Sequence, residues 1–253
     1  MNEQRDREDL IIGRNAILEA LRAGRELDTL FVAKGERVGS ISKIIAICRD
    51  TGIPIKEVDI KKLDFMCAHE THQGIVASAA VQSYATVDEI FEVANERGEK
   101  PFIIICDEIE DPHNLGAIIR SAECAGAHGV IIPKRRSASL SFAVSKTSAG
   151  AIEYMPVARV SNLSATIDDL KKRGVWIYGA DIQGENWCQT DYTDAVGLVI
   201  GSEGNGLGRL IREKCDFIVS LPMKGHIESL NASVAAGIVM FEVTRQRAGL
   251  KSV

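Results

Sequence analysis

The sequence predicts an α/β protein whose C-terminal part is built on a mostly parallel sheet. Aliphatic runs with strand character alternate with helix-like segments along most of the chain. The composition changes in 83–100, which is rich in charged residues. A chain of 253 residues with 45% hydrophobic content is long enough for two modest cores. We therefore expect a first domain over 1–82, a linker over 83–100 and a second domain over 101–253.

The first domain is predicted from a regular alternation of short helices and strands. Aliphatic residues recur at helical spacing in a stretch that ends at Gly24, and a second helix-like stretch ends at Gly52. The expected elements are a helix over 13–24, a strand over 29–33, a helix over 41–52, a strand over 53–58, a helix over 60–68 and a strand over 74–81. This pattern indicates a small α/β domain.

The second domain follows one short amphipathic helix in the linker and begins with a nearly all-aliphatic run. Such a run is typical of a central strand that is covered on both faces. The expected elements are strands over 102–106, 129–133, 175–180 and 195–201 and helices over 115–127 and 162–174. Regular alternation of this kind favours parallel strands with helices on both faces. Because ligands of such sheets bind at the carboxyl ends of strands, we expect a site built from 107–120, 201–208 and 222–231.

The composition and net charge of the chain are those expected of an ordinary soluble enzyme. A net charge of −5 and a pI near 5.6 mean that any nucleic acid would need local basic patches. No apolar run approaches the roughly 20 residues of a membrane span, and the N-terminus lacks the apolar segment of a signal peptide. The six cysteines form no Cys-x-x-Cys pair, which favours core thiols over a zinc site or disulfides. We expect a cytoplasmic protein with no membrane partner.

A glycine-rich loop, "GSEGNGLG" over 201–208, directly follows an aliphatic strand. Its glycines permit tight turns and a close approach of the backbone to a ligand. It is not a dinucleotide fingerprint, because Arg209 stands where the third glycine belongs, and it is not a P-loop, because Leu207 follows Gly206. A simple turn is the alternative interpretation.

The segment "DEIEDPHNLGAIIRSAECAGAHG" over 107–129 places Asn114 where it would cap a helix that contains Arg120. An arginine on the buried side of an apolar helix needs a carboxylate or phosphate partner. The segment therefore indicates either a site or a structural pair between Arg120 and Asp107 or Glu108.

Basic residues gather after the strand over 129–133, in a chain that is acidic overall. Lys134, Arg135, Arg136 and Lys146 alternate with serine hydroxyls, and both kinds of group suit a phosphate backbone. A solvated surface is the alternative.

A metal site is not expected. The stretch "CAHETH" misses the H-E-x-x-H zinc motif, because Gln73 stands where the second histidine belongs, and no second ligand cluster completes a site. His69 and His72 are expected in a loop, as polar surface or substrate contacts.

Polar residues stand at the head of an apolar helix-like stretch near the end of the chain. Glu228, Ser229, Asn231 and Ser233 occur in "LPMKGHIESLNASVAAGIVMFEVTRQR", where burial would favour aliphatic residues.

Three segments together resemble the motifs of the SpoU (TrmH) branch of the SPOUT RNA 2′-O-ribose methyltransferases. They are "NLGAIIRSAECAG", "LVIGSEGNGL" and "LPMKGHIESLNASVAAGI", in this order. The N-terminal segments "IIGRNAILEAL" and "THQGIVA" resemble the L30e-like substrate-binding domain of the bacterial group that methylates a guanosine ribose in 23S rRNA. The resemblance extends through almost the whole chain.

The resemblance implies a trefoil-knotted C-terminal domain that binds S-adenosylmethionine, needs no metal, and forms a homodimer. It implies a catalytic group comprising Arg120, Asn114, Glu203, Ser229 and Asn231. It implies donor binding by Gly201, Ser202, Gly204, Leu221, Met223 and Leu230. Contacts to RNA are expected from Arg14, His72, Gln73, Lys134, Arg135, Arg136 and Lys146.

The resemblance gives Arg120 the central role. A guanidinium stays protonated at neutral pH and is therefore a poor base, so we expect Arg120 to stabilise the negative charge on the attacking 2′-oxygen. Glu203 would receive the proton or hold Arg120. A ribose methyltransferase for tRNA and a non-catalytic RNA-binding or ribosome-assembly factor are the alternative functions.

Overall fold

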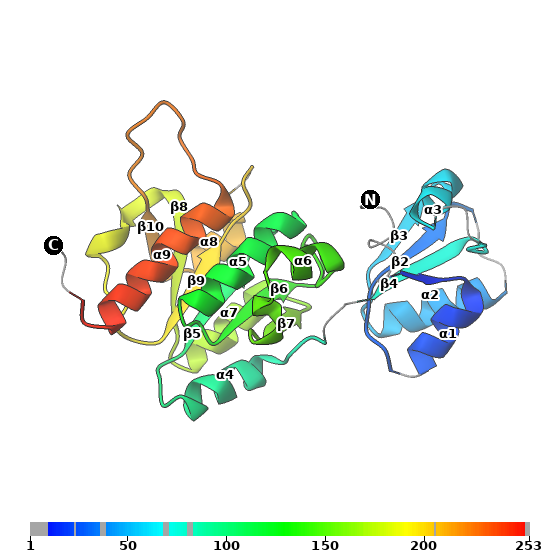
Figure 1. Cartoon of the computed structure of the whole chain (residues 1–253), viewed down its shortest axis with the longest axis horizontal. Coiled ribbons are helices and arrows are strands. Elements are labelled where there is room, and N and C mark those ends of the chain that lie inside the picture. Colours follow the sequence, from blue (N-terminus) through cyan, green and yellow to red (C-terminus); the bar gives the residue numbers. More distant parts are fainter. Residues whose placement is uncertain are drawn as a thin grey trace. The chain divides into compact units, whose positions relative to one another are not determined.

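The computed structural model describes residues 10–22, 24–35, 39–67, 71–79, 83–204 and 206–250. The chain divides into two compact units, with the main boundary between Ser83 and Tyr84 (Figure 1). The expected end of the first domain at residue 82 lies outside the described residues, as does His69.

The N-terminal unit is a four-stranded sheet in the order β1-β4-β2-β3. Its elements are β1 (Leu10–Ile12), α1 (Arg14–Arg22), β2 (Leu27–Ala33), α2 (Ser40–Asp50), β3 (Ile55–Val58), α3 (Ile60–Met66) and β4 (Ile75–Ala79). Strand β4 pairs antiparallel with β1 and β2, and β2 pairs parallel with β3. One core contains Ile17 of α1 and Ile44 of α2, and a separate core contains Leu63 of α3. Both faces of the sheet are therefore covered.

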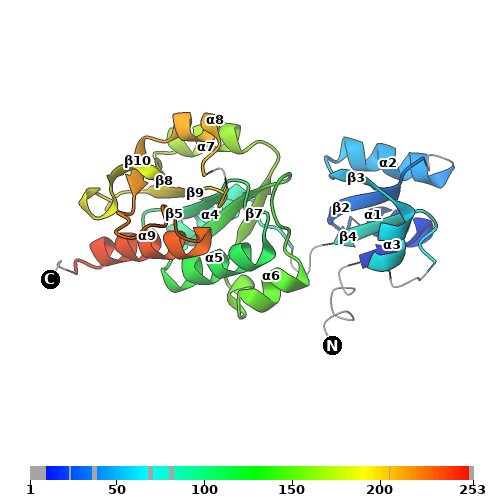
Figure 2. The ribbon, with the colours of Figure 1, turned by 90° about the horizontal axis from the view of Figure 1, so that it is seen from above.

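The C-terminal unit is a six-stranded sheet in the order β10-β8-β9-β5-β6-β7, with every neighbouring pair parallel. Its strands are β5 (Phe102–Cys106), β6 (Gly129–Pro133), β7 (Val157–Val160), β8 (Trp176–Asn186), β9 (Val196–Ile200) and β10 (Phe217–Ser220). Its helices are α4 (Val87–Glu96), α5 (Pro112–Cys124), α6 (Phe142–Thr147), η1 (Ala151–Glu153), α7 (Leu163–Lys172), η2 (Trp187–Gln189), α8 (Arg209–Lys214) and α9 (Ala232–Arg247). Helices α5 and α9 cover one face and α7 and α8 the other (Figure 2). The expected parallel α/β class is confirmed.

The segment expected as a linker contains helix α4, which belongs to the C-terminal unit. The helix begins with a capping box, in which Thr86 and Glu89 bond each other's backbone N–H groups. Its Ile90 is fully buried in one core cluster with Ile167 and Leu170 of α7. Residues 84–100 are therefore packed structure, since an amphipathic helix beside a sheet buries its apolar side.

The strand order reverses between β5 and β9. The chain runs outward from β5 to β6 and β7, crosses to β8, and returns with β9 beside β5. Cys106 and Ile200 are paired at the ends of these two strands, so the loops that follow leave the sheet side by side. Such a reversal point is where open α/β sheets form their binding crevices.

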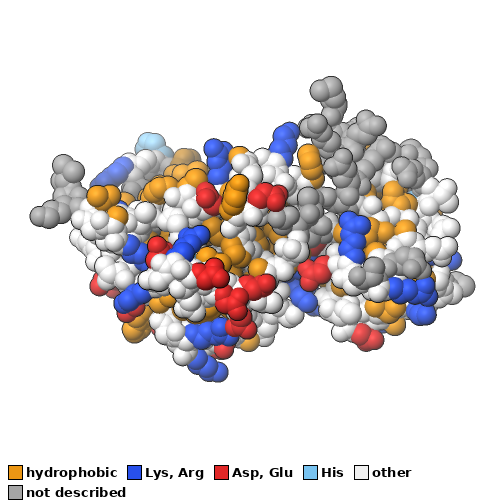
Figure 3. Space-filling view, turned by 60° about the horizontal axis from the view of Figure 1, so that its bottom comes forward, with side chains coloured by type: hydrophobic (Ala, Val, Ile, Leu, Met, Phe, Trp, Pro, Cys, Tyr) orange, Lys and Arg blue, Asp and Glu red, His pale blue; other side chains and the backbone are white. Residues whose placement is uncertain are grey.

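The expectations about a membrane span and about a knot apply to the chain as a whole. None of the helices in the described part is both long and apolar enough to cross a membrane. The trefoil knot stays a prediction. On the face in Figure 3, several acidic side chains lie close together on the C-terminal unit, with basic side chains around them.

Candidate active site

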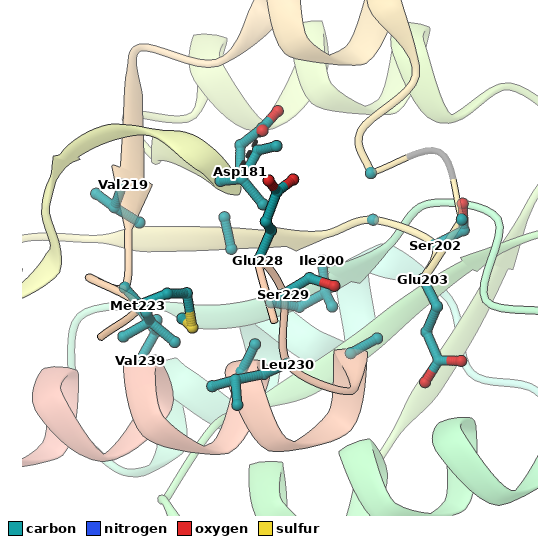
Figure 4. Close-up of a pocket in the computed structure, with 18 residues that line it drawn as sticks. Asp181, Ile200, Ser202, Glu203, Val219, Met223, Glu228, Ser229, Leu230 and Val239 are labelled. Atoms are coloured by element: carbon teal, nitrogen blue, oxygen red, sulfur yellow. Dashed lines mark hydrogen bonds between the residues drawn. The ribbon is translucent and has the colours of Figure 1, made fainter. Parts of the chain in front are cut away.

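A cavity of about 330 Å³ lies at the carboxyl edge of the C-terminal sheet. It is formed by the middle of β8, by the ends of β9 and β10 with the loops that follow them, and by the first half of α9 (Figure 4). All six residues expected to bind the donor line it: Gly201, Ser202, Gly204, Leu221, Met223 and Leu230. Glu203 and Ser229, expected in catalysis, line it as well.

The lining has a marked chemical polarity. Met223, Leu230 and Val239 gather on one side, while Ser202 and Glu203 lie on the other (Figure 4). The charged side chains among the described lining residues are the carboxylates of Asp181, Glu203 and Glu228. Such a cavity suits a ligand with an apolar body and a positive charge.

The glycine-rich loop is fixed at both ends by backbone hydrogen bonds. Ser202 and Gly206 exchange two of them, with N···O distances of 3.0 and 2.9 Å. The buried Asp107 carboxylate accepts the Gly208 N–H at 2.8 Å. Burial raises the pKa of Asp107, and the Gly208 N–H partly opposes this effect because it favours the charged form. Asp107 thus ties the end of the loop to the end of β5.

Replacing Gly201 by alanine is expected to abolish donor binding. The added Cβ would meet the backbone of Gly206 and lie 2.6 Å from the Leu207 nitrogen, and backbone atoms in this turn have little room to move. Gly225→Ala is the matched control, because a Cβ there meets nothing within 4 Å. Calorimetric titration with S-adenosylmethionine measures both. Unchanged affinity in Gly201→Ala would show that this turn is not part of the donor site.

Asn114, Glu203 and Asn231 form one hydrogen-bonded cluster. Asn114 Nδ2 donates to Glu203 Oε1 at 3.0 Å, and Asn231 Nδ2 donates to the same oxygen and to Asn114 Oδ1, the latter at 2.8 Å. Three segments that are far apart in the sequence meet here.

The starts of two helices hold this cluster in place. Asn231 caps α9, with its Oδ1 accepting from Ser233 N at 3.0 Å and Val234 N at 3.3 Å. Helix α5 is capped by Asp111, whose Oδ1 accepts from His113 N at 3.0 Å. The expected capping role of Asn114 is therefore wrong: its side chain points to Glu203 from the first turn of α5.

A second cavity of about 340 Å³ adjoins the first. The two share Ser202, Glu203 and Gly204, and the second is completed by Asn114 and by the segment from Glu108 to Asp111. Glu203 therefore stands where the two cavities meet.

Arg120 does not join this cluster within the subunit. It is exposed on α5 and lines neither cavity. Six helical positions separate it from Asn114, which turns it about 120° away around the helix axis. The alternative structural pair is also absent in the described residues: Asp107 accepts from Gly208, and Glu108 pairs with Arg136 at 2.7 Å.

The residues expected to bind RNA have mixed environments. Lys134 is partly buried, while Arg135, Arg136 and Lys146 are exposed at the carboxyl edge or on α6. Arg136 is held by Glu108, which raises the pKa of its guanidinium.

In the N-terminal unit, Arg14 and Gln73 are joined. Arg14 Nε donates to the backbone carbonyl of Gln73 at 3.1 Å. The backbone N–H of Arg14 donates to Gln73 Oε1 at 3.2 Å. His72 differs from its expected place on the surface, because its ring is buried and bonded at both nitrogens, to Asp64 and to the Gly74 N–H. A ring so engaged positions the loop and does not face RNA.

Several lining residues were not expected from the sequence: Asp181, Ile182, Val219 and Val239. Glu228 lies in the loop over 222–231 that was expected to form the site. Asp181 directly follows a stretch that was expected as a strand, and the rule that ligands bind at carboxyl ends of strands would have indicated it. Val219 belongs to β10, which was not expected at all. In the described residues no group of three or more His, Cys, Asp or Glu side chains is arranged to hold a metal ion.

Comparisons with known proteins identify the family. Residues 101–241 match the model of the SpoU rRNA Methylase family, and residues 10–85 match that of RNA 2′-O ribose methyltransferase substrate binding. The chain belongs to the SpoU/TrmH family of RNA 2′-O-ribose methyltransferases. The SpoU match contains Asn114, Glu203 and Asn231, so the cluster lies in the methyltransferase part of the chain.

Individual relatives agree with this family. A putative TrmH family tRNA/rRNA methyltransferase of Bacillus subtilis, YacO, is 48% identical over 240 residues, which cover 94% of this chain and 96% of that relative. The SpoU methyltransferase AviRb from Streptomyces viridochromogenes, solved with AdoMet, has a TM-score of 0.61 and 27% identity over 98% of this chain and 95% of its own. The A. aeolicus TrmH/SpoU tRNA modifying enzyme has a TM-score of 0.56 and 28% identity over 60% and 77%.

Proposed function

We propose that this SpoU/TrmH enzyme transfers a methyl group from S-adenosylmethionine to the 2′-oxygen of a guanosine ribose in 23S rRNA. The observation that carries the proposal is the position of Glu203. It is held by Asn114 and Asn231 at the junction of two cavities, one for the donor and one for the acceptor nucleoside.

The first cavity fits the methyl donor. Its aliphatic wall suits an adenine ring, the backbone of the Gly201 loop offers hydrogen bonds, and its carboxylates suit a cation. Donor binding by the family relative AviRb supports the same assignment. Bound S-adenosylmethionine supplies an electrophilic methyl group on a positively charged sulfur.

Glu203 is the proton acceptor in this proposal. Its Oε1 receives two amide hydrogens, while Oε2 receives none from the described residues. Oε2 takes the proton of the ribose 2′-hydroxyl as the 2′-oxygen forms its bond to the methyl carbon and the carbon–sulfur bond breaks. The neutral amides of Asn114 and Asn231 fix the carboxylate without supplying a counter-charge.

The starts of α5 and α9 lower the barrier further. Asn114 lies in the first turn of α5 and Asn231 caps α9, so both helices begin at the reacting centre. The positive ends of their dipoles stabilise the negative charge that grows on the 2′-oxygen. Ser229, which lines the donor cavity, is placed to orient the ribose.

Arg120 acts from a second copy of the chain in this proposal. Helix α9 lies beside α5 and leaves Val234, Ile238 and Phe241 exposed by 50, 36 and 50% on one stripe, although its opposite side is already buried. Such a stripe suits a two-fold interface between homodimer subunits. Arg120, exposed on the neighbouring helix α5, would then reach the centre of the partner subunit and stabilise the attacking oxygen.

An rRNA substrate is supported by the two family models. The C-terminal match is to a family named for rRNA methylation, and a separate substrate-binding match covers 10–85. A tRNA substrate is the second candidate, because relatives are named for both RNAs. A non-catalytic binding factor would not need Glu203 held between two cavities.

Transfer of labelled methyl groups tests the proposal. The enzyme is incubated with tritiated S-adenosylmethionine and either rRNA or tRNA from a strain that lacks the gene, and the product is digested and mapped. We expect label in 23S rRNA at one guanosine whose 3′ linkage resists alkaline hydrolysis. Label confined to tRNA would establish the second candidate. Donor binding without transfer to either RNA would favour the binding factor.

A further inference from the structure

Helix α3 lies on the outside of the N-terminal unit (Figure 1), and its Phe65 ring is exposed to solvent. Leu63 is fully buried and Met66 packs beside it, so one side of this short helix covers the sheet. Phe65 lies on the outer side with 79% of its surface exposed, the highest value among the large hydrophobic residues in the described part of the chain. Covering so large a ring with a ligand would bury a large apolar area and would therefore be favourable.

The charges around Phe65 are unbalanced. Lys61 and Lys62 stand four and three positions before it, so both lie on its side of the helix, and both are exposed. The two nearby carboxylates are engaged elsewhere: Asp59 pairs with Lys34 at 3.3 Å and Asp64 with His72 at 3.0 Å. Within the described residues, neither Lys61 nor Lys62 has a carboxylate partner.

The helix is held firmly to its neighbours. His72 joins Asp64 of α3 to the Gly74 N–H, both at 3.0 Å, which fixes the loop before β4. The same loop carries Gln73, whose backbone and side chain bond Arg14 at the start of α1. These hydrogen bonds fix α3 relative to the loop before β4, so the outward direction of Phe65 is set by the packed structure.

We propose that Phe65 is a stacking platform for an unpaired base of the RNA substrate, with Lys61 and Lys62 bound to the phosphates on either side. An exposed aromatic ring flanked by cations is the usual arrangement for single-stranded RNA, because every base has a face that stacks and every linkage carries a negative charge. The inference rests on the proposed action on RNA. It adds a contact point for a single-stranded segment in the N-terminal unit, on residues other than those that surround the methylated ribose.

Fluorescence anisotropy with full-length enzyme tests the platform. The probes are a fluorescein-labelled oligoadenylate of about 12 nucleotides and a duplex of equal length. Phe65→Ala is expected to weaken binding of the single strand about tenfold and to affect the duplex little, because paired bases are not available for stacking. Phe65→Tyr keeps a stacking face and is expected to retain the affinity. Ile60→Ala, on the same helix and also exposed, is the control.

The lysines are tested by the salt dependence. Affinity for the single strand falls as the salt concentration rises. Replacing both Lys61 and Lys62 by alanine is expected to make the slope of log affinity against log salt concentration shallower by about 1.4, which is the value for two phosphate contacts on a single strand. With rRNA as substrate, Phe65→Ala is expected to raise KM and to leave kcat at saturating RNA unchanged.

Each contrary result has a distinct meaning. If Phe65→Ala binds the single strand as tightly as wild type, the platform is refuted while the proposed function stands. If Phe65→Leu also keeps the affinity, the ring serves an apolar contact and stacking is refuted. If the wild-type enzyme transfers no methyl group to any RNA, the proposed function itself fails. Thermal unfolding of each variant shows that the N-terminal unit remains folded.

Discussion

Replacing Glu203 by glutamine is expected to reduce the rate of methyl transfer by about 10²–10⁴-fold, the usual contribution of a positioned proton acceptor. Glutamine keeps the size of the side chain and an oxygen that accepts from Asn114 and Asn231. It removes the charge that receives the 2′-hydroxyl proton. Because only one of several groups around the donor changes, S-adenosylmethionine should still bind within about tenfold of the wild-type affinity. Single-turnover kinetics with saturating donor measures the rate, and calorimetry measures the affinity.

The matched comparison is Asn114→Asp, which alters the partner of Glu203 and leaves the carboxylate in place. A second negative charge beside Glu203 should slow the reaction at neutral pH and permit partial recovery in acid, since protonation of one carboxyl relieves the repulsion. Retention of more than about a third of the wild-type rate in Glu203→Gln would remove Glu203 from proton transfer.

Replacing Arg120 by alanine is expected to reduce kcat by about 10²–10³-fold, the usual cost of losing one donor to a developing oxyanion. Affinity for S-adenosylmethionine should stay at the wild-type value, because Arg120 does not line the donor cavity. Arg120→Lys should recover part of the rate, since an ammonium keeps the charge but not the two-pronged geometry of a guanidinium.

Lys172→Ala is the control for loss of a surface charge. It removes one cation from α7, which lies on the opposite face of the sheet (Figure 2). It should reduce kcat less than twofold, within the usual range of surface substitutions. Substantial turnover in Arg120→Ala would show that the helix starts and Glu203 suffice for the reaction.

Much of the fold was predictable because the C-terminal strands carry a strong signal. The runs over 102–106 and 129–133 are apolar throughout, as burial on both faces requires, and the structure forms strands there. The strands that were missed are β1, β7 and β10. Each has only three or four residues and lies beside a single neighbour at a sheet edge, so neither length nor burial creates a distinct pattern.

The part of the site that lies in loops at the carboxyl ends of the strands could be predicted from the sequence. The resemblance indicated Asn114, Glu203 and Asn231, and the structure brings them together at the reversal point between β5 and β9. Two features could not be read from the sequence. Asp111 caps α5 in place of Asn114, because it stands directly before Pro112, the first residue of the helix. Arg120 lies outside the cluster, because the direction of a side chain around a helix axis depends on the residue at which the helix begins.

Activity of a mixed dimer tests the central claim most directly, namely that Glu203 of one subunit and Arg120 of the other act on the same ribose. Arg120→Ala and Glu203→Gln chains are co-expressed with different affinity tags, and the heterodimer is purified through both. Each variant alone is expected to be at least about 100-fold slower than wild type. The heterodimer contains one centre with both groups intact, so about half of the wild-type kcat per dimer is expected. A heterodimer as inactive as its parents would show that both residues must come from the same chain, and would contradict the account.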